Sequence, residues 1–281
     1  MRTTWSLHHI NNADSFSFCA DSYSRFKFGD EAIAREFGTT LAIGFIQRHL
    51  LIKPITQQIV VISSPYSFIP TATFAMKIWF VYYLNRWLAG NGYNVVQDTR
   101  VHRTITYKED YGELDAQQRI NLIGNDSFHI DKEFLTDKTL IFLDDIKITG
   151  SHEKMIMKMI SSYGLSNDIY LLYFAELVNK DIHPNIENFL NYHQVKTIFD
   201  LEPIIQSGNF CINTRIVKYI INYNPDCFGI FIQNQSAGFV NLLYDMAIGN
   251  GYHTIDAYTK NLNFITRNLF INHKTLINHG N

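Results

Sequence analysis

The sequence has 281 residues, of which 46% are hydrophobic and 18% charged, and its formal net charge is −2. This composition is typical of a globular protein and excludes a disordered chain, while the small net charge gives no general reason to expect nucleic-acid or membrane binding. Its cysteines, Cys19, Cys211 and Cys227, are too few and too scattered for a disulfide framework or a zinc cluster. The N-terminus lacks an apolar signal-peptide core and no apolar run approaches the length of a membrane span, so a cytoplasmic protein is expected.

The first fifty residues divide into a polar start and an amphipathic helix. Asp30 is suited to cap this helix, in which apolar residues recur at every fourth position from residue 33 to residue 45. Before the cap, Arg25 and Lys27 flank Phe26, so in an extended segment both cations would share one side. We interpret them as contacts to a phosphate or substrate; a solvated basic pair is the alternative.

The next segment has the pattern of a strand, a loop and a long helix, which typically opens a parallel sheet. Residues 58–63 form the expected strand, residues 71–88 the helix, and residues 93–96 a further strand. The loop after the first strand begins Ser63-Ser64-Pro65-Tyr66 and is either a ligand-binding loop or an ordinary connection.

Residues 99–131 form the longest polar interval, with a helix expected over residues 115–122. A segment of this length between core strands is usually functional or mobile. It contains Arg103 and Lys108 among further cations and tyrosines, and a solvated hairpin without a catalytic task is the alternative.

The most informative stretch is residues 139–153, T-L-I-F-L-D-D-I-K-I-T-G-S-H-E. Residues 139–143 predict a buried strand that Asp144 and Asp145 end, and a short loop then leads into a helix. Free N–H groups at a helix start attract anions, and a glycine lets phosphate approach the backbone. Carboxylates repel phosphate, so the acidic pair should face sugar hydroxyls or a hydrated Mg²⁺.

Further strands are expected at residues 169–174 and 195–199, with a helix between them at residues 184–192. From residue 201 onward the pattern is mostly helical and amphipathic, for example over residues 215–223 and 239–248. The chain is therefore predicted to be an α/β protein with an open, mostly parallel sheet flanked by helices.

Residues 140–151, L-I-F-L-D-D-I-K-I-T-G-S, resemble the phosphoribosyl-pyrophosphate (PRPP) motif of type I phosphoribosyltransferases. The resemblance implies a Mg²⁺-dependent enzyme that transfers a 5-phosphoribosyl group from PRPP to a nitrogen of a nucleobase-like acceptor. It implies that Asp144 and Asp145 hold the ribose hydroxyls, and that the loop of residues 100–119 closes over PRPP. The other implied PRPP contacts are Lys147, Thr149, Gly150 and Ser151 for the 5′-phosphate, Ser63, Ser64, Pro65 and Tyr66 for pyrophosphate, and Arg103 and Lys108 for the closing loop.

The same resemblance divides the chain into residues 1–50, an N-terminal hood segment and helix, residues 51–200, the α/β core, and residues 201–281, a helical C-terminal hood. All three are expected to form one compact unit. By this resemblance the hood would cover the carboxyl edge of the sheet and select the acceptor, and Arg25 and Lys27 would contact ligand from it. The motif I-T-G-S-H-E also resembles uncharacterised bacterial phosphoribosyltransferase-like proteins, some of them encoded near tellurite-resistance genes. Such a protein would act on PRPP and a small molecule without nucleic acid or membrane, and it could form a homodimer.

Ile148 stands where many 6-oxopurine salvage enzymes carry an aspartate, so hypoxanthine and guanine are disfavoured as acceptors. One alternative is a regulatory protein of the same fold that binds PRPP or a nucleotide without transfer. Another is a phosphohydrolase or PRPP synthetase that uses Asp144 and Asp145 as magnesium ligands, although the sequence contains no G-x-x-x-x-G-K loop. His152, next to the phosphate loop, is a further residue that could touch a ligand.

Overall fold

The computed structural model describes residues 1–99, 101–103 and 128–277. Its centre is a five-stranded parallel sheet in the order β1-β7-β6-β2-β3. The strands are β1 (Arg2–Ile10), β2 (Ile59–Ser63), β3 (Gln97–Asp98), β6 (Thr139–Lys147) and β7 (Ile169–Leu177). A separate antiparallel pair joins β4 (His102–Arg103) to β5 (Phe128–His129). The expected open parallel sheet is confirmed.

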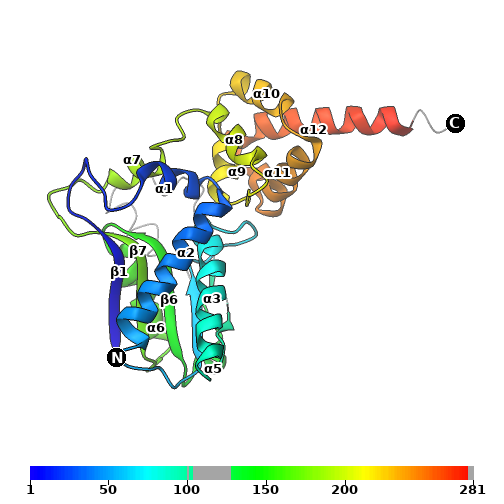
Figure 1. Cartoon of the computed structure of the whole chain (residues 1–281). Helices are drawn as coiled ribbons and strands as arrows, with labels where there is room; N and C mark the ends of the chain where they lie inside the picture. Colours follow the sequence, from blue (N-terminus) through cyan, green and yellow to red (C-terminus); the bar gives the residue numbers. More distant parts are fainter. Residues whose placement is uncertain (100, 104–127, 278–281) are drawn as a thin grey trace.

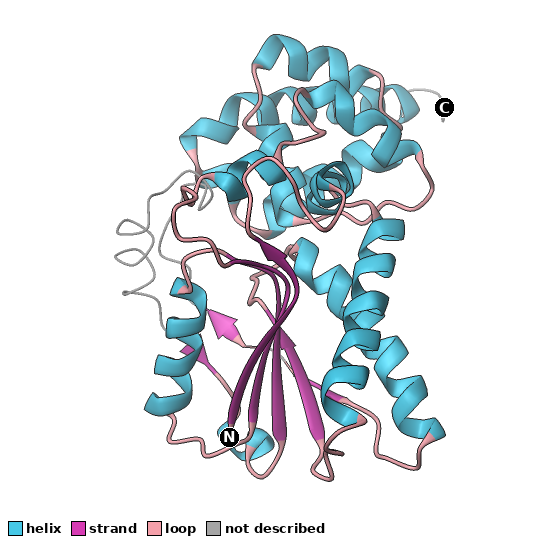
Figure 2. Ribbon diagram, turned by 60° about the vertical axis from the view of Figure 1, so that its left-hand side comes forward, coloured by secondary structure: helices cyan, strands magenta, loops and turns pink. Residues whose placement is uncertain are grey.

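Helices connect the strands and cover both faces of the sheet, as Figure 2 shows. The first part of the chain contributes α1 (Ala20–Lys27), α2 (Glu31–Phe45) with its π-helical extension η1 (Ile46–Leu50), and α3 (Ala72–Gly90). The second part contributes α5 (Lys132–Leu135), α6 (Ser151–Ser162) and α7 (Ile186–Asn191). The β2–α3–β3 and β6–α6–β7 units are the parallel crossovers that the sequence pattern predicts.

The side chains of β2 and β6 alternate between two hydrophobic cores, because successive residues of a strand point to opposite faces. Val61 and Ile141 pack with α2 and α3, whereas Ile62 and Phe142 pack with α6. Both strands are therefore buried on both sides, as expected for central strands of a parallel sheet.

The C-terminal helical region, residues 195–277, lies beyond one end of the sheet (Figure 1). It has a core of its own, which also takes in Phe28 after α1 and Ile69 before α3. The region consists of η3 (Ile198–Leu201), α8 (Glu202–Gln206), α9 (Thr214–Ile221), α10 (Pro225–Gln233), α11 (Ala237–Gly249), η4 (Tyr252–Thr254) and α12 (Asp256–Ile277). In the part of the chain that is described, no helix combines the length and the hydropathy that crossing a membrane requires.

Several sequence expectations about local structure are wrong. The polar start contains the edge strand β1, which pairs with β7 from Arg2 onward. Residues 93–96 are a loop before β3, and residues 195–199 run into a 3₁₀ helix instead of a strand. Both differences concern short segments, in which tertiary contacts outweigh weak local preferences. The helix expected at residues 115–122 lies outside the described residues.

Candidate functional site

The acidic pair lies within β6 and does not end it, which corrects the sequence expectation. Pairing with β7 continues through Asp144, opposite Tyr173, to Lys147, opposite Glu176. Because the pair is in extended backbone, the two carboxylates leave the strand on opposite faces. Asp144 contacts α6, Asp145 contacts α1, and Thr73 of α3 is within hydrogen-bonding distance of both carboxylates.

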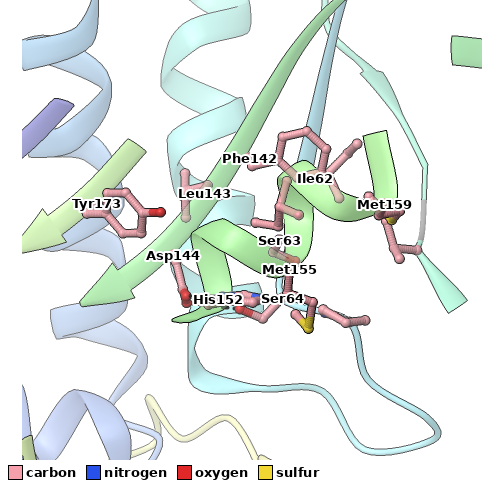
Figure 3. Close-up of a pocket in the computed structure, with 13 residues that line it drawn as sticks. Ile62, Ser63, Ser64, Phe142, Leu143, Asp144, His152, Met155, Met159 and Tyr173 are labelled. Atoms are coloured by element: carbon pink, nitrogen blue, oxygen red, sulfur yellow. Dashed lines mark hydrogen bonds and ion pairs between the residues drawn. The ribbon is translucent and has the colours of Figure 1, made fainter. Parts of the chain in front are cut away.

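Asp144 contacts one loop and one helix at the end of the sheet. Its Oδ1 accepts a hydrogen bond from Ser64 Oγ at 2.9 Å, and its Oδ2 lies 2.6 Å from Nδ1 of His152. Figure 3 shows these three side chains near one another, beside a small, mostly apolar pocket. Asp144 therefore connects the loop after β2 with the start of α6.

Asp145 is buried and is surrounded by donors. Lys27 forms an ion pair with its Oδ2, which also accepts a hydrogen bond from the Tyr23 hydroxyl at 2.6 Å. Thr73 Oγ1 donates to Oδ1 at 3.1 Å. Burial by itself would raise the pKa of Asp145, but the positive charge of Lys27 and the hydrogen bonds outweigh it and hold this pKa well below its usual range. Asp145 is thus a stable anion, neutralised within the chain.

The phosphate-binding loop predicted from the sequence leads directly into α6. Gly150 has a φ of 72°, a left-handed conformation that favours glycine. The hydroxyls of Thr149 and Ser151 are 2.7 Å apart, and the backbone N–H of Ser151 donates to Thr149 Oγ1 at 3.3 Å. These two hydroxyls and the N-terminus of a twelve-residue helix provide the donors that an anion needs.

Lys147, the last residue of β6, forms ion pairs with two carboxylates next to this loop. Its Nζ lies 2.9 Å from Glu153 Oε2 and 2.9 Å from Glu176 Oε1. Arg2 also forms an ion pair with Glu153. Lys147 is therefore paired with two carboxylates and not with Asp144. A phosphate would compete with these two carboxylates for the ammonium group.

A cavity of about 650 Å³ lies between the carboxyl edge of the sheet and the helices beyond it. This size is within the range usual for small-molecule sites. From the sheet side, Asp144, Asp145, Lys147, the loop of residues 148–151 and the loop of residues 64–67 line it. From the helical side come Glu187, Thr214, Arg215, Lys218 and residues 250–252 and 254–255. The cavity thus joins the two loops that the sequence predicted to bind phosphates with the carboxylates between them.

The other predicted site residues are divided between this cavity and the rest of the molecule. Ser64, Pro65 and Tyr66 line the cavity, whereas Ser63 lines only the small apolar pocket. Arg103 pairs through its backbone with Phe128 in the β4–β5 ladder, and Lys108 lies outside the described residues.

Arg25 and Lys27 do not form a shared basic surface, because residues 20–27 are helical and not extended. Positions two apart on a helix point in different directions. Arg25 pairs with Asp30 at 2.5 Å, and Lys27 reaches the cavity and binds Asp145.

The sequence reasoning missed Tyr23 and Thr73, which contact Asp145, and the cavity-lining residues of α9. Thr73 is a polar side chain within the apolar helix α3, and such buried polar groups normally have a partner, whereas Tyr23 lies in a mostly polar helix that carried no such signal. Arg215 and Lys218 stand three apart on the polar face of an amphipathic helix, which was the signal available for them.

A doubly covered parallel sheet with an acidic pair and a T-G-S loop at its carboxyl edge defines a type I phosphoribosyltransferase-like protein. Residues 1–265 match the model of the family described as PRTase ComF-like, so the chain belongs to the ComF-like phosphoribosyltransferase family. No curated protein matches the sequence.

Two solved structures with similarity to the chain are crystal forms of a hypoxanthine phosphoribosyltransferase from Staphylococcus aureus. The tetragonal form is 10% identical with a TM-score of 0.33, and the match covers 53% of this chain and 75% of that chain. The orthorhombic form is 9% identical with a TM-score of 0.29, and the match covers 59% and 80%. At these values neither structure bears on the acceptor of this chain.

Proposed function

We propose that the protein transfers a 5-phosphoribosyl group from PRPP to a nitrogen of a nucleobase-like acceptor. In this reaction the bond from C1 of the ribose to pyrophosphate breaks, a bond from C1 to the nitrogen forms, and pyrophosphate leaves. An acceptor N–H group releases its proton, whereas a pyridine-type nitrogen, which has no proton, becomes positively charged. The observation that carries the proposal is the cavity of about 650 Å³, which brings the T-G-S loop, the acidic pair and the loop of residues 64–67 together. Membership of the ComF-like family supports phosphoribosyl chemistry in general.

Each wall of the cavity suits one part of PRPP. Thr149, Ser151 and the N-terminus of α6 would bind the 5′-phosphate, and the loop that contains Ser64 would bind the pyrophosphate. Asp144 would accept hydrogen bonds from ribose hydroxyls after exchanging Ser64 or His152 for them. The negative charge of the acidic pair also suits the positive charge that develops on the sugar in the transition state.

Magnesium would be held mainly by the substrate. Carboxylate oxygens are suitable Mg²⁺ ligands, but among the described residues no group of three or more histidine, cysteine, aspartate or glutamate side chains is arranged to hold a metal ion. A Mg²⁺ ion bound to the pyrophosphate and to water, near Asp144, would neutralise the leaving group.

The test is the release of pyrophosphate from PRPP and Mg²⁺ in the presence of a panel of nitrogen heterocycles. The double variant Asp144→Asn with Asp145→Asn should reduce the rate by at least about 10²-fold, the usual cost of removing one aimed electrostatic group. Asp168→Asn is the control, because Asp168 precedes the amino end of β7, pairs with the N-terminal ammonium group and does not line the cavity; this variant should retain the wild-type rate. Equal rates for the double variant and the wild type would exclude this assignment.

A second function, PRPP binding for regulation without transfer, is favoured by one specific observation. Both carboxylates and Lys147 already have oppositely charged or hydrogen-bonding partners in the chain. Such a site could exchange these partners for PRPP and thereby change the position of α1, which carries Lys27. Calorimetric binding of PRPP without pyrophosphate release from any heterocycle would favour the regulator.

A further inference from the structure

One wall of the cavity is cationic and belongs to the C-terminal helical region. Arg215 and Lys218 of α9 both line the cavity, and because they are three residues apart they lie on the same face of the helix. The opposite face of α9, with Ile216, Val217 and Ile220, is buried in the core of that region. The packing of α9 therefore directs both cations toward the acidic edge of the sheet.

On the helical wall of the cavity, the positive charges of the described lining residues outnumber the negative ones. Among the described lining residues beyond position 177, Glu187 of α7 is the only carboxylate. On the sheet side, Asp145 is paired with Lys27 and Glu153 with Arg2 and Lys147. Asp144, in contrast, contacts only Ser64, Thr73 and His152 among the described side chains and lies across the cavity from α9. A net positive charge thus remains on the helical wall.

Each cation also stands next to an aromatic ring. The Arg215 guanidinium carbon is 5.7 Å from the centre of the Tyr192 ring, and Lys218 Nζ is 5.8 Å from the centre of the Tyr252 ring. Tyr252 lines the cavity as well. A cation beside an aromatic surface suits a flat heterocycle that carries an acidic group, because the ring can stack while the anion pairs with the cation.

The start of α9 is fixed relative to the reacting edge of the sheet. Thr214 Oγ1 donates to the carbonyl oxygen of Ile69 at 2.8 Å, and the backbone N–H of Thr214 donates to Pro70 at 2.9 Å. Asn213 Nδ2 donates to the carbonyl oxygen of Lys27 at 3.1 Å. These bonds join α9 to the loop before α3 and to α1, so the cations have a defined position above the acidic pair.

We propose that the acceptor is an anionic heterocycle, a nitrogen-containing ring with a carboxylate or similar acid group, and that Arg215 and Lys218 bind this group. The inference rests on the proposed phosphoribosyl transfer and specifies its acceptor. The planar guanidinium of Arg215 can donate two parallel hydrogen bonds to a carboxylate, and Lys218 adds a second charge.

The experiment compares two pairs of probes that differ in charge, nicotinate with nicotinamide and orotate with uracil. Pyrophosphate release is measured with the full chain, PRPP and Mg²⁺, and binding of the same four probes is measured by calorimetry. In at least one pair the acid should be preferred by about tenfold to a hundredfold, as expected for hydrogen bonds to charged groups. Arg215→Gln should reduce that ratio by about tenfold, while Lys260→Gln, an exposed cation of α12, should leave it unchanged.

Equal or better use of the neutral probe in both pairs would overturn the inference, as would an acid preference that Arg215→Gln does not reduce. If no probe releases pyrophosphate, the proposed transfer is not supported for these bases, and the calorimetric comparison still decides the inference. Absence of binding by both acids would then overturn it, whereas acid binding that Arg215→Gln weakens would support it.

Discussion

Lys27 of α1 and Asp145 of β6 form a buried ion pair although 118 residues separate them in the sequence. Their side chains are 12% and 7% exposed, so both charges are largely removed from water. Tyr23, one turn earlier in α1, donates a further hydrogen bond to the same carboxylate. The N-terminal helix therefore contributes directly to the electrostatics of the acidic pair, and its position depends on that pair.

Lys27→Met should destabilise the protein by about 3–5 kcal/mol, because it leaves the Asp145 carboxylate buried without its cation. Denaturant unfolding followed by circular dichroism measures the loss. Lys154→Met is the control, because Lys154 of α6 is exposed and its replacement should change the stability by no more than about 0.5 kcal/mol. Similar stabilities for the two variants would contradict the buried ion pair.

Stability should fall in acid through Asp145. Because the pKa of this carboxyl is lower in the folded chain than in the unfolded chain, the unfolded chain binds more protons as the pH falls. The contribution of Asp145 is therefore fully present above the unfolded pKa of about 4 and is lost as the pH falls through the folded value. Urea midpoints measured from about pH 6 down to pH 2 should decline less steeply in Asp145→Asn than in the wild type. Parallel curves would assign the acid sensitivity to other carboxyls.

Gly150→Ala should weaken PRPP binding as well as folding. Residue 150 has a positive φ, which costs an L-residue about 1–2 kcal/mol, although a Cβ there would meet only Lys147 Cε at 3.7 Å. Gly164, after α6, also has a positive φ, of 61°, and Gly164→Ala should cost a similar amount of stability. PRPP affinity measured by calorimetry should distinguish the two variants. Only Gly150→Ala should bind PRPP more weakly, because only Gly150 belongs to the loop next to the proposed phosphate site. Equal PRPP affinities would exclude this role for the loop backbone.

Asn213→Ala should loosen the connection between α9 and the sheet. The Asn213 side chain caps α9 by accepting from Ile216 N at 3.1 Å and donates to the carbonyl of Lys27. Loss of a cap costs about 1 kcal/mol, and loss of the second hydrogen bond adds a comparable amount. Ser236→Ala, which removes only the cap of α11, should cost about half as much in thermal or denaturant unfolding. A smaller loss for Asn213→Ala than for Ser236→Ala would contradict the second contact.

The sequence by itself determined the parts of the fold in which local pattern and burial agree. The central strands β2 and β6 are continuous apolar runs, and α2 and α3 have recognisable caps at Asp30 and Thr71. The T-G-S loop is recognisable because glycine is required where φ is positive. Such features depend on residues close together in the chain, and the PRPP motif belongs to them.

The edge strand β1 and the extent of β6 were decided by the tertiary structure. Many residues of β1 are exposed or only half-buried, so its sequence carries little of the apolar pattern that marks a central strand. Asp144 and Asp145 remain in β6 because β7 supplies backbone hydrogen-bonding partners up to Lys147. From the local sequence alone, a carboxylate pair resembles a strand end, because the residues of β7 that pair with β6 are far away in the sequence.

The partners of the acidic pair were also decided by the tertiary structure. Lys27 and Thr73 come from α1 and α3, and no local spacing relates them to Asp145, whereas His152 is close to Asp144 in the sequence. Arg215 and Lys218 reach the same cavity only because α9 packs its apolar face into a separate core. The sequence determines which residue types can bind phosphate and ribose, whereas long-range packing determines which charges they meet, because electrostatic interactions depend on distance in space and on burial.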